Sequence, residues 1–146
     1  MNRLLQKNVK MVLRRRPELQ PLFDKLLSMG GEYVVLAFNE RDYVNILHRG
    51  FLQDGKYPIM KLGTPCHCHS NSAALWDINR NFLRIVTGYA LSKDQLWRQH
   101  SWCVNILETM GNGHARIVET TVKRILYFGY MLTETESEEF FAQNCL

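Results

Sequence analysis

The spacing of apolar residues changes near residue 80, and this change limits the fold more than any other feature of the sequence. Before it, leucines and valines recur at the three- and four-residue intervals of amphipathic helices, over 4–13 and 19–27. After it, apolar and aromatic residues form short continuous runs, which are typical of strands. We predict strands at 82–91, 100–107, 116–122 and 125–132. The order predicts an α+β fold, with N-terminal helices and a C-terminal antiparallel sheet.

The middle of the chain is mixed. The sequence predicts a buried strand at 33–38, a short helix at 40–49, a turn-rich passage at 55–65 and a helix at 70–79. Gly111-Asn112-Gly113 predicts a turn between two of the strands, and Thr133 with Glu136 resembles a capping box that opens a last helix. Cys66 and Cys68 lie just before the helix at 70–79, which is expected to pack on the sheet.

The length of 146 residues suits one domain with one core. We divide it into a helical N-terminal part, 1–50, and a catalytic core, 64–132. The net charge of +4 comes largely from basic residues near the N-terminus, Arg14-Arg15-Arg16 among them. An excess of positive charge this small is typical of a solvated helix face. We therefore do not expect a nucleic-acid partner.

Targeting signals and disulfides are not expected. No apolar stretch has the length of about 20 residues that a membrane-spanning helix needs, and the N-terminus lacks the features of a secretory signal. The four cysteines are not needed as disulfides in a domain of this size. We therefore expect no membrane association. We expect the protein to be located in a reducing cytoplasm, either of a bacterium or of a host cell that receives the protein.

The segment TPCHCHSNSAALW, residues 64–76, concentrates reactive side chains just before a predicted helix. A helix N-terminus lowers the pKa of a thiol through its partial positive charge, and its free N–H groups can hold an oxyanion. Cys68 lies nearer the helix than Cys66 and is the preferred nucleophile, by a small margin. Asn71, in the first turn, is a candidate for contacting the substrate or the oxyanion.

A base and an orienting group follow downstream. His100, at the start of a predicted strand, could present its ring at a sheet edge, and Glu119 is the best strand-borne carboxylate to orient it. Gln99 and Trp102 flank the histidine and are further candidates for contacting the substrate, although Trp102 also fits a core position.

The order of these residues resembles the transglutaminase-like and papain-like cysteine-hydrolase superfamily. A cysteine at a helix start precedes a His-Ser-Trp strand and then a Val-Glu-Thr-Thr strand, over about Cys66 to Thr121. The resemblance implies Cys68 as nucleophile, His100 as base and Glu119 as orienting residue, where the superfamily usually has aspartate or asparagine. It implies a hydrolase or acyltransferase that acts on an amide, ester or thioester carbonyl of a peptide, a protein or a small molecule, without a cofactor.

The triad requires a particular strand register. If Asn112 centred a symmetric hairpin, Glu119 would lie opposite Asn105, and its side chain would point to the face opposite that of His100. The triad therefore needs a hairpin centred nearer residues 109–110, or a bulge that shifts the register.

A zinc site is the alternative. Cys66, Cys68, His100 and Cys103 offer four thiolate and imidazole ligands. However, Cys-x-Cys is a short spacing for zinc, and His100 and Cys103 point to opposite faces of a strand. Cys103 and Cys145 also fit small buried hydrophobes. Further candidate ligands are His67, His69 and His114. On this hypothesis the chain is a zinc-stabilised or protein-binding module whose basic N-terminal helices form the contact surface.

Overall fold

The computed structural model describes residues 2–146 and confirms the α+β prediction. The helices are α1 (Arg3–Arg15), the 3-10 helix η1 (Pro17–Leu19), α2 (Gln20–Met29), α3 (Tyr43–Arg49), α4 (Cys68–Asp77) and α5 (Glu134–Cys145). The strands are β1 (Tyr33–Val34), β2 (Phe51–Asp54), β3 (Ile59–Met60), β4 (Leu83–Leu91), β5 (Leu96–Thr109), β6 (Ala115–Glu119) and β7 (Leu126–Met131). No helix within residues 2–146 has both the length and the apolar character to cross a membrane.

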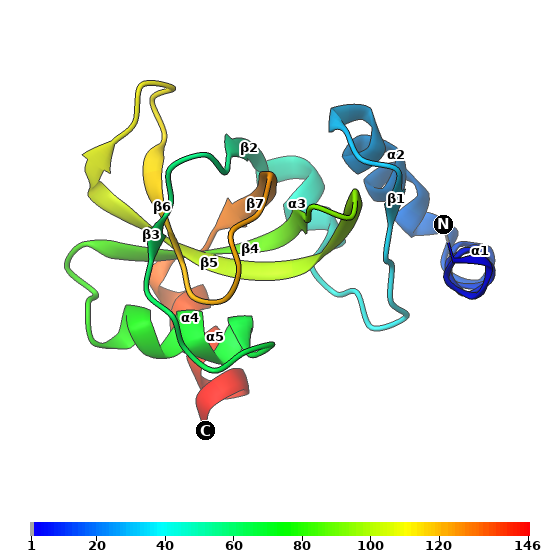
Figure 1. The fold of residues 1–146 in the computed structure, drawn as a ribbon. Helices are drawn as coiled ribbons and strands as arrows, with labels where there is room; N and C mark the ends of the chain where they lie inside the picture. The colour runs from blue at the N-terminus through cyan, green and yellow to red at the C-terminus, as the bar shows by residue number, and fades with distance from the viewer. Residues whose placement is uncertain (1) are drawn as a thin grey trace.

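The strands form one sheet with the order β2-β7-β4-β5-β6-β3, and β1 pairs with β5 (Figure 1). The pairings from β2 to β6 are antiparallel, whereas β3 on β6 and β1 on β5 are parallel. β4 pairs with β5 along one edge, and β1 and β6 share the other edge. On that edge β1 pairs with β5 as far as Trp97, and the pairing of β6 with β5 starts at Cys103. Residues 98–102 of β5 therefore have no strand partner on that edge among residues 2–146.

The two faces of the sheet bury different clusters. The larger core includes Trp76 of α4 and Cys103 of β5, together with apolar residues of α1 and α2. The smaller core, on the other face, contains Trp102, Ile117 and Tyr127. Since side chains alternate along β5, His100 shares the face of Trp102, and Ser101 that of Cys103. α4 and α5 lie side by side against the sheet, whereas α1 lies at the opposite end of the molecule (Figure 1).

Two predictions about strands are corrected by the structure. The strand predicted at 33–38 pairs over two residues only. The apolar run instead reflects the burial of Val34 and Leu36 in the core, which does not require strand pairing. The passage at 55–65 contains β3, which the sequence did not predict. A two-residue strand is held by backbone pairing with the distant β6, and this leaves no local pattern in the sequence.

Candidate active site

The hairpin of β5 and β6 contains the register shift that the triad needs. Near its tip Thr109 pairs with Ala115, as in a hairpin centred on Asn112. An irregularity then shifts the register, so that Asn105 pairs with Arg116. Side chains of β6 thereby change faces relative to β5. Continued along the strands, this register places Glu119 opposite Trp102 and on the face that carries His100.

His100 and Glu119 form a buried pair. The two residues are 1% and 0% exposed, and Nε2 of His100 lies 2.7 Å from Oε1 of Glu119. The Tyr127 hydroxyl donates to the same oxygen at 2.8 Å. Oε2 accepts from the Thr120 and Thr121 N–H groups and from the Thr121 hydroxyl at 2.9, 3.0 and 3.1 Å. Burial raises the pKa of Glu119, but the contacts with His100 and the other donors outweigh it and hold the pKa below its usual value.

Cys68, the first residue of α4, completes the group. Burial raises the pKa of its thiol, but hydrogen bonds and charge interactions with His100 and then His69 outweigh this and lower the pKa from 9.0 to about 5. Burial lowers the pKa of His100, whereas the contacts with Cys68 and Glu119 raise it above 6.5 overall. The favoured state is therefore a Cys68 thiolate beside a His100 imidazolium.

The N-terminus of α4 is open beside this thiolate. The N-cap, His67, contributes no side-chain cap, and the first amide that bonds back along the chain is that of Asn71, to the His67 carbonyl at 2.9 Å. The N–H groups of Cys68, His69 and Ser70 have no acceptor among residues 2–146. Such groups can bind a negatively charged oxygen next to the sulfur.

His69 also belongs to the site, although the sequence suggested it only as a further candidate zinc ligand and not as a partner of the nucleophile. Its Nδ1 lies 2.6 Å from the Ser101 hydroxyl, which lies 2.8 Å from the Thr87 hydroxyl. His69 also borders a pocket of about 220 Å³ between α3, α5 and the sheet. Cys68 thus faces one imidazole from each side of β5. A histidine directly after the candidate nucleophile was the one available signal.

The three predicted substrate-contacting residues hold other contacts. Asn71 bonds to the backbone of Thr64, accepting its N–H at 3.2 Å and donating to its carbonyl at 2.8 Å. Gln99 donates to Glu40 at 2.9 Å, on the face opposite His100. Trp102 is fully buried and stacks on His100 with 5.8 Å between ring centroids. Each of the three residues is thus held by contacts within the protein, and their contact with a substrate stays a prediction.

Replacement of Asn71 with alanine tests the contribution of its contacts. The change removes both hydrogen bonds that hold the Thr64 loop to α4. We expect the free energy of unfolding to fall by about 1–2 kcal/mol, measured by urea denaturation. Asn8 is an exposed helical asparagine whose side chain bonds to nothing within residues 2–146, so Asn8→Ala should change stability by less than about 0.5 kcal/mol. Equal effects of the two changes would contradict the assignment.

The other three cysteines lie apart from the buried pair of His100 and Glu119. Cys66 is exposed on the loop before α4, with a positive φ of 61°. Cys103 is buried and donates to the Ser72 carbonyl at 3.4 Å. Burial and the Glu119 charge raise the pKa of Cys103 to about 12. Cys145 is exposed near the end of the chain, so the expectation of a small buried hydrophobe is confirmed for Cys103 and wrong for Cys145.

The alternative zinc set is not assembled in the structure. Among residues 2–146 no three His, Cys, Asp or Glu side chains converge as metal ligands, so Cys66, Cys68, His100 and Cys103 do not form a cage. The two other candidate histidines are occupied elsewhere. His67 lies 2.7 Å from the Pro65 carbonyl, and His114 stacks on Phe51.

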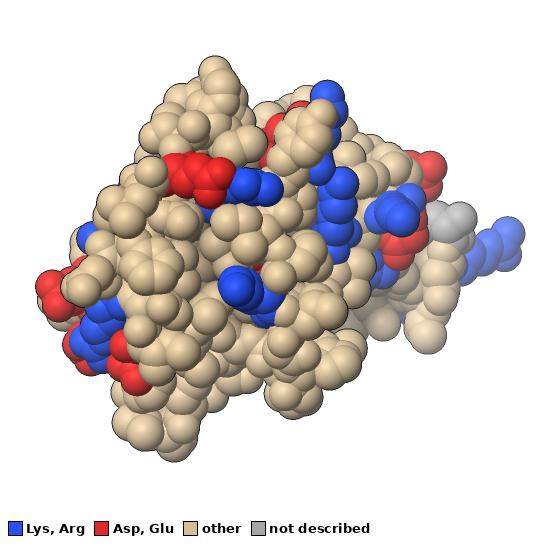
Figure 2. All heavy atoms as spheres, turned by 60° about the vertical axis from the view of Figure 1, so that its left-hand side comes forward, with Lys and Arg blue, Asp and Glu red and all other residues tan. Residues whose placement is uncertain are grey.

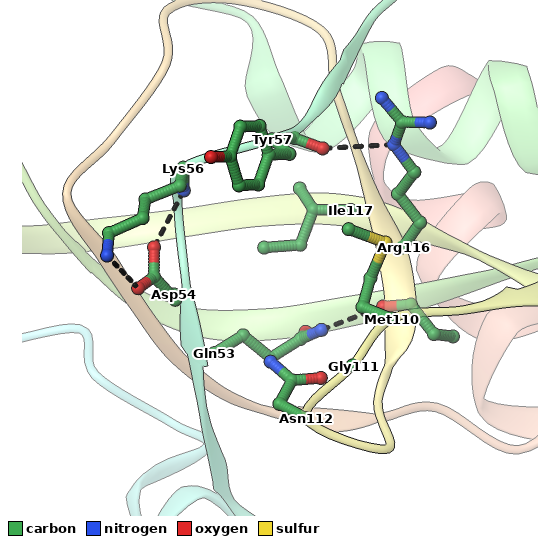
Figure 3. A pocket seen from close by; sticks show the side chains of 10 residues that line it. Gln53, Asp54, Lys56, Tyr57, Met110, Gly111, Asn112, Arg116 and Ile117 are labelled. Carbon is green, nitrogen blue, oxygen red and sulfur yellow. Dashed lines mark hydrogen bonds and ion pairs between the residues drawn. The ribbon is translucent and has the colours of Figure 1, made fainter.

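A second pocket, of about 250 Å³, lies at the tip of the β5–β6 hairpin (Figure 3). The Gln53 amide bridges β2 to β6 by donating to the Ala115 carbonyl at 2.9 Å, and Tyr57, Met110 and Ile117 supply walls. No cysteine or histidine lines this pocket, so it does not share the chemistry of the Cys68 site.

The chain was compared with protein-family models, curated proteins and solved structures, and none of them matches. Interpretation of the site therefore depends on its geometry. Residues from α4, β5 and β6 converge in the order thiolate, imidazole and carboxylate.

Proposed function

We propose that the protein is a cysteine-dependent hydrolase or acyltransferase that acts on an amide, ester or thioester carbonyl. Cys68 is the nucleophile, His100 the acid and base, and Glu119 the orienting residue. The observation that carries the proposal is the convergence of these three groups at an open helix N-terminus, with the pKa of Cys68 lowered to about 5.

The reaction follows from the protonation states. The Cys68 thiolate attacks the carbonyl carbon, and the carbonyl π electrons move to oxygen, which faces the free N–H groups of α4. The bond to the leaving group then breaks, and the leaving group takes the proton of the His100 imidazolium. An acyl thioester on Cys68 and a neutral imidazole result.

The second half restores the thiolate. Neutral His100 takes a proton from water or from an amine, whose oxygen or nitrogen attacks the thioester carbonyl. The C–S bond breaks, and a carboxylic acid or a transferred amide leaves. Glu119 holds Nε2 of His100 throughout, which leaves Nδ1 for Cys68.

The chemistry also bears on location. A thiolate nucleophile must stay reduced, and the four cysteines of the structure are all free. The proposal therefore includes a reducing compartment such as the cytoplasm, with a peptide, protein or small acyl compound as substrate.

Selective alkylation tests the nucleophile. At pH 6 Cys68 should be mostly thiolate, whereas an ordinary thiol is less than about 1% ionised. A thiolate of low pKa is also a weaker nucleophile, which offsets part of this advantage. We expect iodoacetamide to modify Cys68 about tenfold faster than Cys66 or Cys145, measured by peptide mapping.

The acyl-enzyme is tested with p-nitrophenyl acetate. Cys68 should be acetylated and then return to the free thiol, while a Cys66→Ser variant behaves as the unmodified protein. Thiolate is lost as pH falls through about 5, and imidazolium is lost as pH rises through the raised pKa of His100. Turnover should therefore be bell-shaped in pH. Acetylation spread evenly over the exposed cysteines would refute the proposal.

A further inference from the structure

The chain that leads to Cys68 forms a free sheet edge. β3 is the end strand of the sheet and pairs with β6 alone. The pairing continues beyond β3, because the Lys61 and Gly63 N–H groups both donate to β6 or to the residue that follows it, at 2.8 Å. The backbone groups of Met60 and Leu62 point the other way, since successive residues of a strand alternate in direction. Within residues 2–146 these outward groups bond to nothing.

This edge ends beside the nucleophile. Asn71 bonds to both backbone groups of Thr64, and a Cβ on Gly63 would lie 2.5 Å from the Asn71 side chain. Asn71 is three residues after Cys68 on α4, so the two side chains are neighbours on the helix surface, about 5–6 Å apart at Cβ. A chain bound along 60–63 would therefore reach the first turn of α4.

Residues 60–67 are all exposed, and the edge carries apolar side chains: Met60 is 40% and Leu62 is 73% exposed. Figure 2 brings forward the side of the molecule that bears β3 in Figure 1. Charged side chains form small separate groups there, with uncharged surface between them. A partner that binds this surface would therefore form backbone hydrogen bonds and apolar contacts with it, rather than be attracted by a patch of one charge.

We infer that the substrate is an extended polypeptide segment that adds as a strand to the edge at residues 60–63 and so presents its amide to Cys68. An extended polypeptide carries N–H and C=O groups at the spacing that the outward groups of Met60 and Leu62 require. A small amide or ester cannot satisfy both residues at once. This inference rests on the proposed function and specifies its substrate class.

The test compares the rates at which three electrophiles modify Cys68. They are chloroacetone, a randomised tetrapeptide library ending in a chloromethyl ketone, and the same library with N-methylated backbone amides. We expect the library to react at least about tenfold faster than chloroacetone, and the N-methylated library to lose that advantage because it lacks the donors for strand addition. Equal rates for the library and its N-methylated form would overturn the inference.

A proline variant gives a second test. Leu62→Pro removes an outward N–H, which an edge strand tolerates, and should lower the ratio of library rate to chloroacetone rate to about one. Leu62→Ala keeps the N–H and should retain most of the ratio. A full ratio in Leu62→Pro would also overturn the inference. Failure of the proposed function is a different result, in which chloroacetone itself fails to prefer Cys68 over Cys66.

Discussion

Replacement of His100 with glutamine is expected to move the pH midpoint of Cys68 alkylation upward from about 5 by about two units or more. Of the two imidazoles that stabilise the thiolate, that of His100 has the larger effect, whereas burial by itself raises the pKa of the thiol. His69 remains in the variant, so the midpoint should stay below that of an ordinary thiol. The measurement is the rate of iodoacetamide modification of Cys68 from pH 4 to 9.

The matched control is His67→Gln. His67 lies one position before Cys68, is exposed, and bonds to the Pro65 carbonyl, so its loss should leave the midpoint in place. His100→Gln should also lower turnover of p-nitrophenyl acetate by about 10²–10⁴-fold, since it removes the general acid and base. An unchanged midpoint in His100→Gln would show that another group sets the ionisation of Cys68.

Replacement of Glu119 with glutamine is expected to lower the free energy of unfolding by about 3 kcal/mol. Both carboxylate oxygens are buried and surrounded by donors from His100, Tyr127, Thr120 and Thr121. A glutamine amide is itself a donor, so whichever oxygen it replaces, its N–H₂ group faces other donors and at least one bond is lost. Urea denaturation at pH 7 measures the difference.

Glu108→Gln is the control on the same hairpin. Glu108 pairs with Arg116 and is 42% exposed, so its replacement should cost less than about 1 kcal/mol. The pH dependence gives a second readout. Because the pKa of Glu119 is lowered on folding, its contribution to stability is present above the unfolded value of 4.5 and is lost as pH falls through the folded value. Glu119→Gln should remove this part of the acid sensitivity, and equal losses in the two variants would contradict the role of Glu119.

Local patterns in the sequence predicted the elements on either side of the site. The helix after Cys68, the strands around His100 and Glu119, and the capping box of Thr133 and Glu136 all appear in the structure, with small differences in their ends. These features depend on residues close together in the chain. β1 and β3 were misjudged and β2 was not predicted, because each of them is defined by pairing with a distant strand.

The position of His100 shows the same limit. It was expected at the start of a strand, whereas β5 begins at Leu96 and His100 lies well inside it. The ring still reaches Cys68, because β1 and β6 leave the edge of β5 open between Trp97 and Cys103. An opening of this kind is produced by three strands together. No pattern within 98–102 could have predicted it.

By itself, the sequence determined the α+β class and identified a thiol, an imidazole and a carboxylate that could act together. Those properties follow from residue type and short-range periodicity. The tertiary structure decided the rest. The register shift between Asn105 and Thr109 places Glu119 on the face of His100. Folding also holds the His69 ring against Ser101 and brings the edge at 60–63 to the first turn of α4. A shift of register moves every side chain of a strand to another face, and its cause lies in long-range pairing that a local pattern does not record.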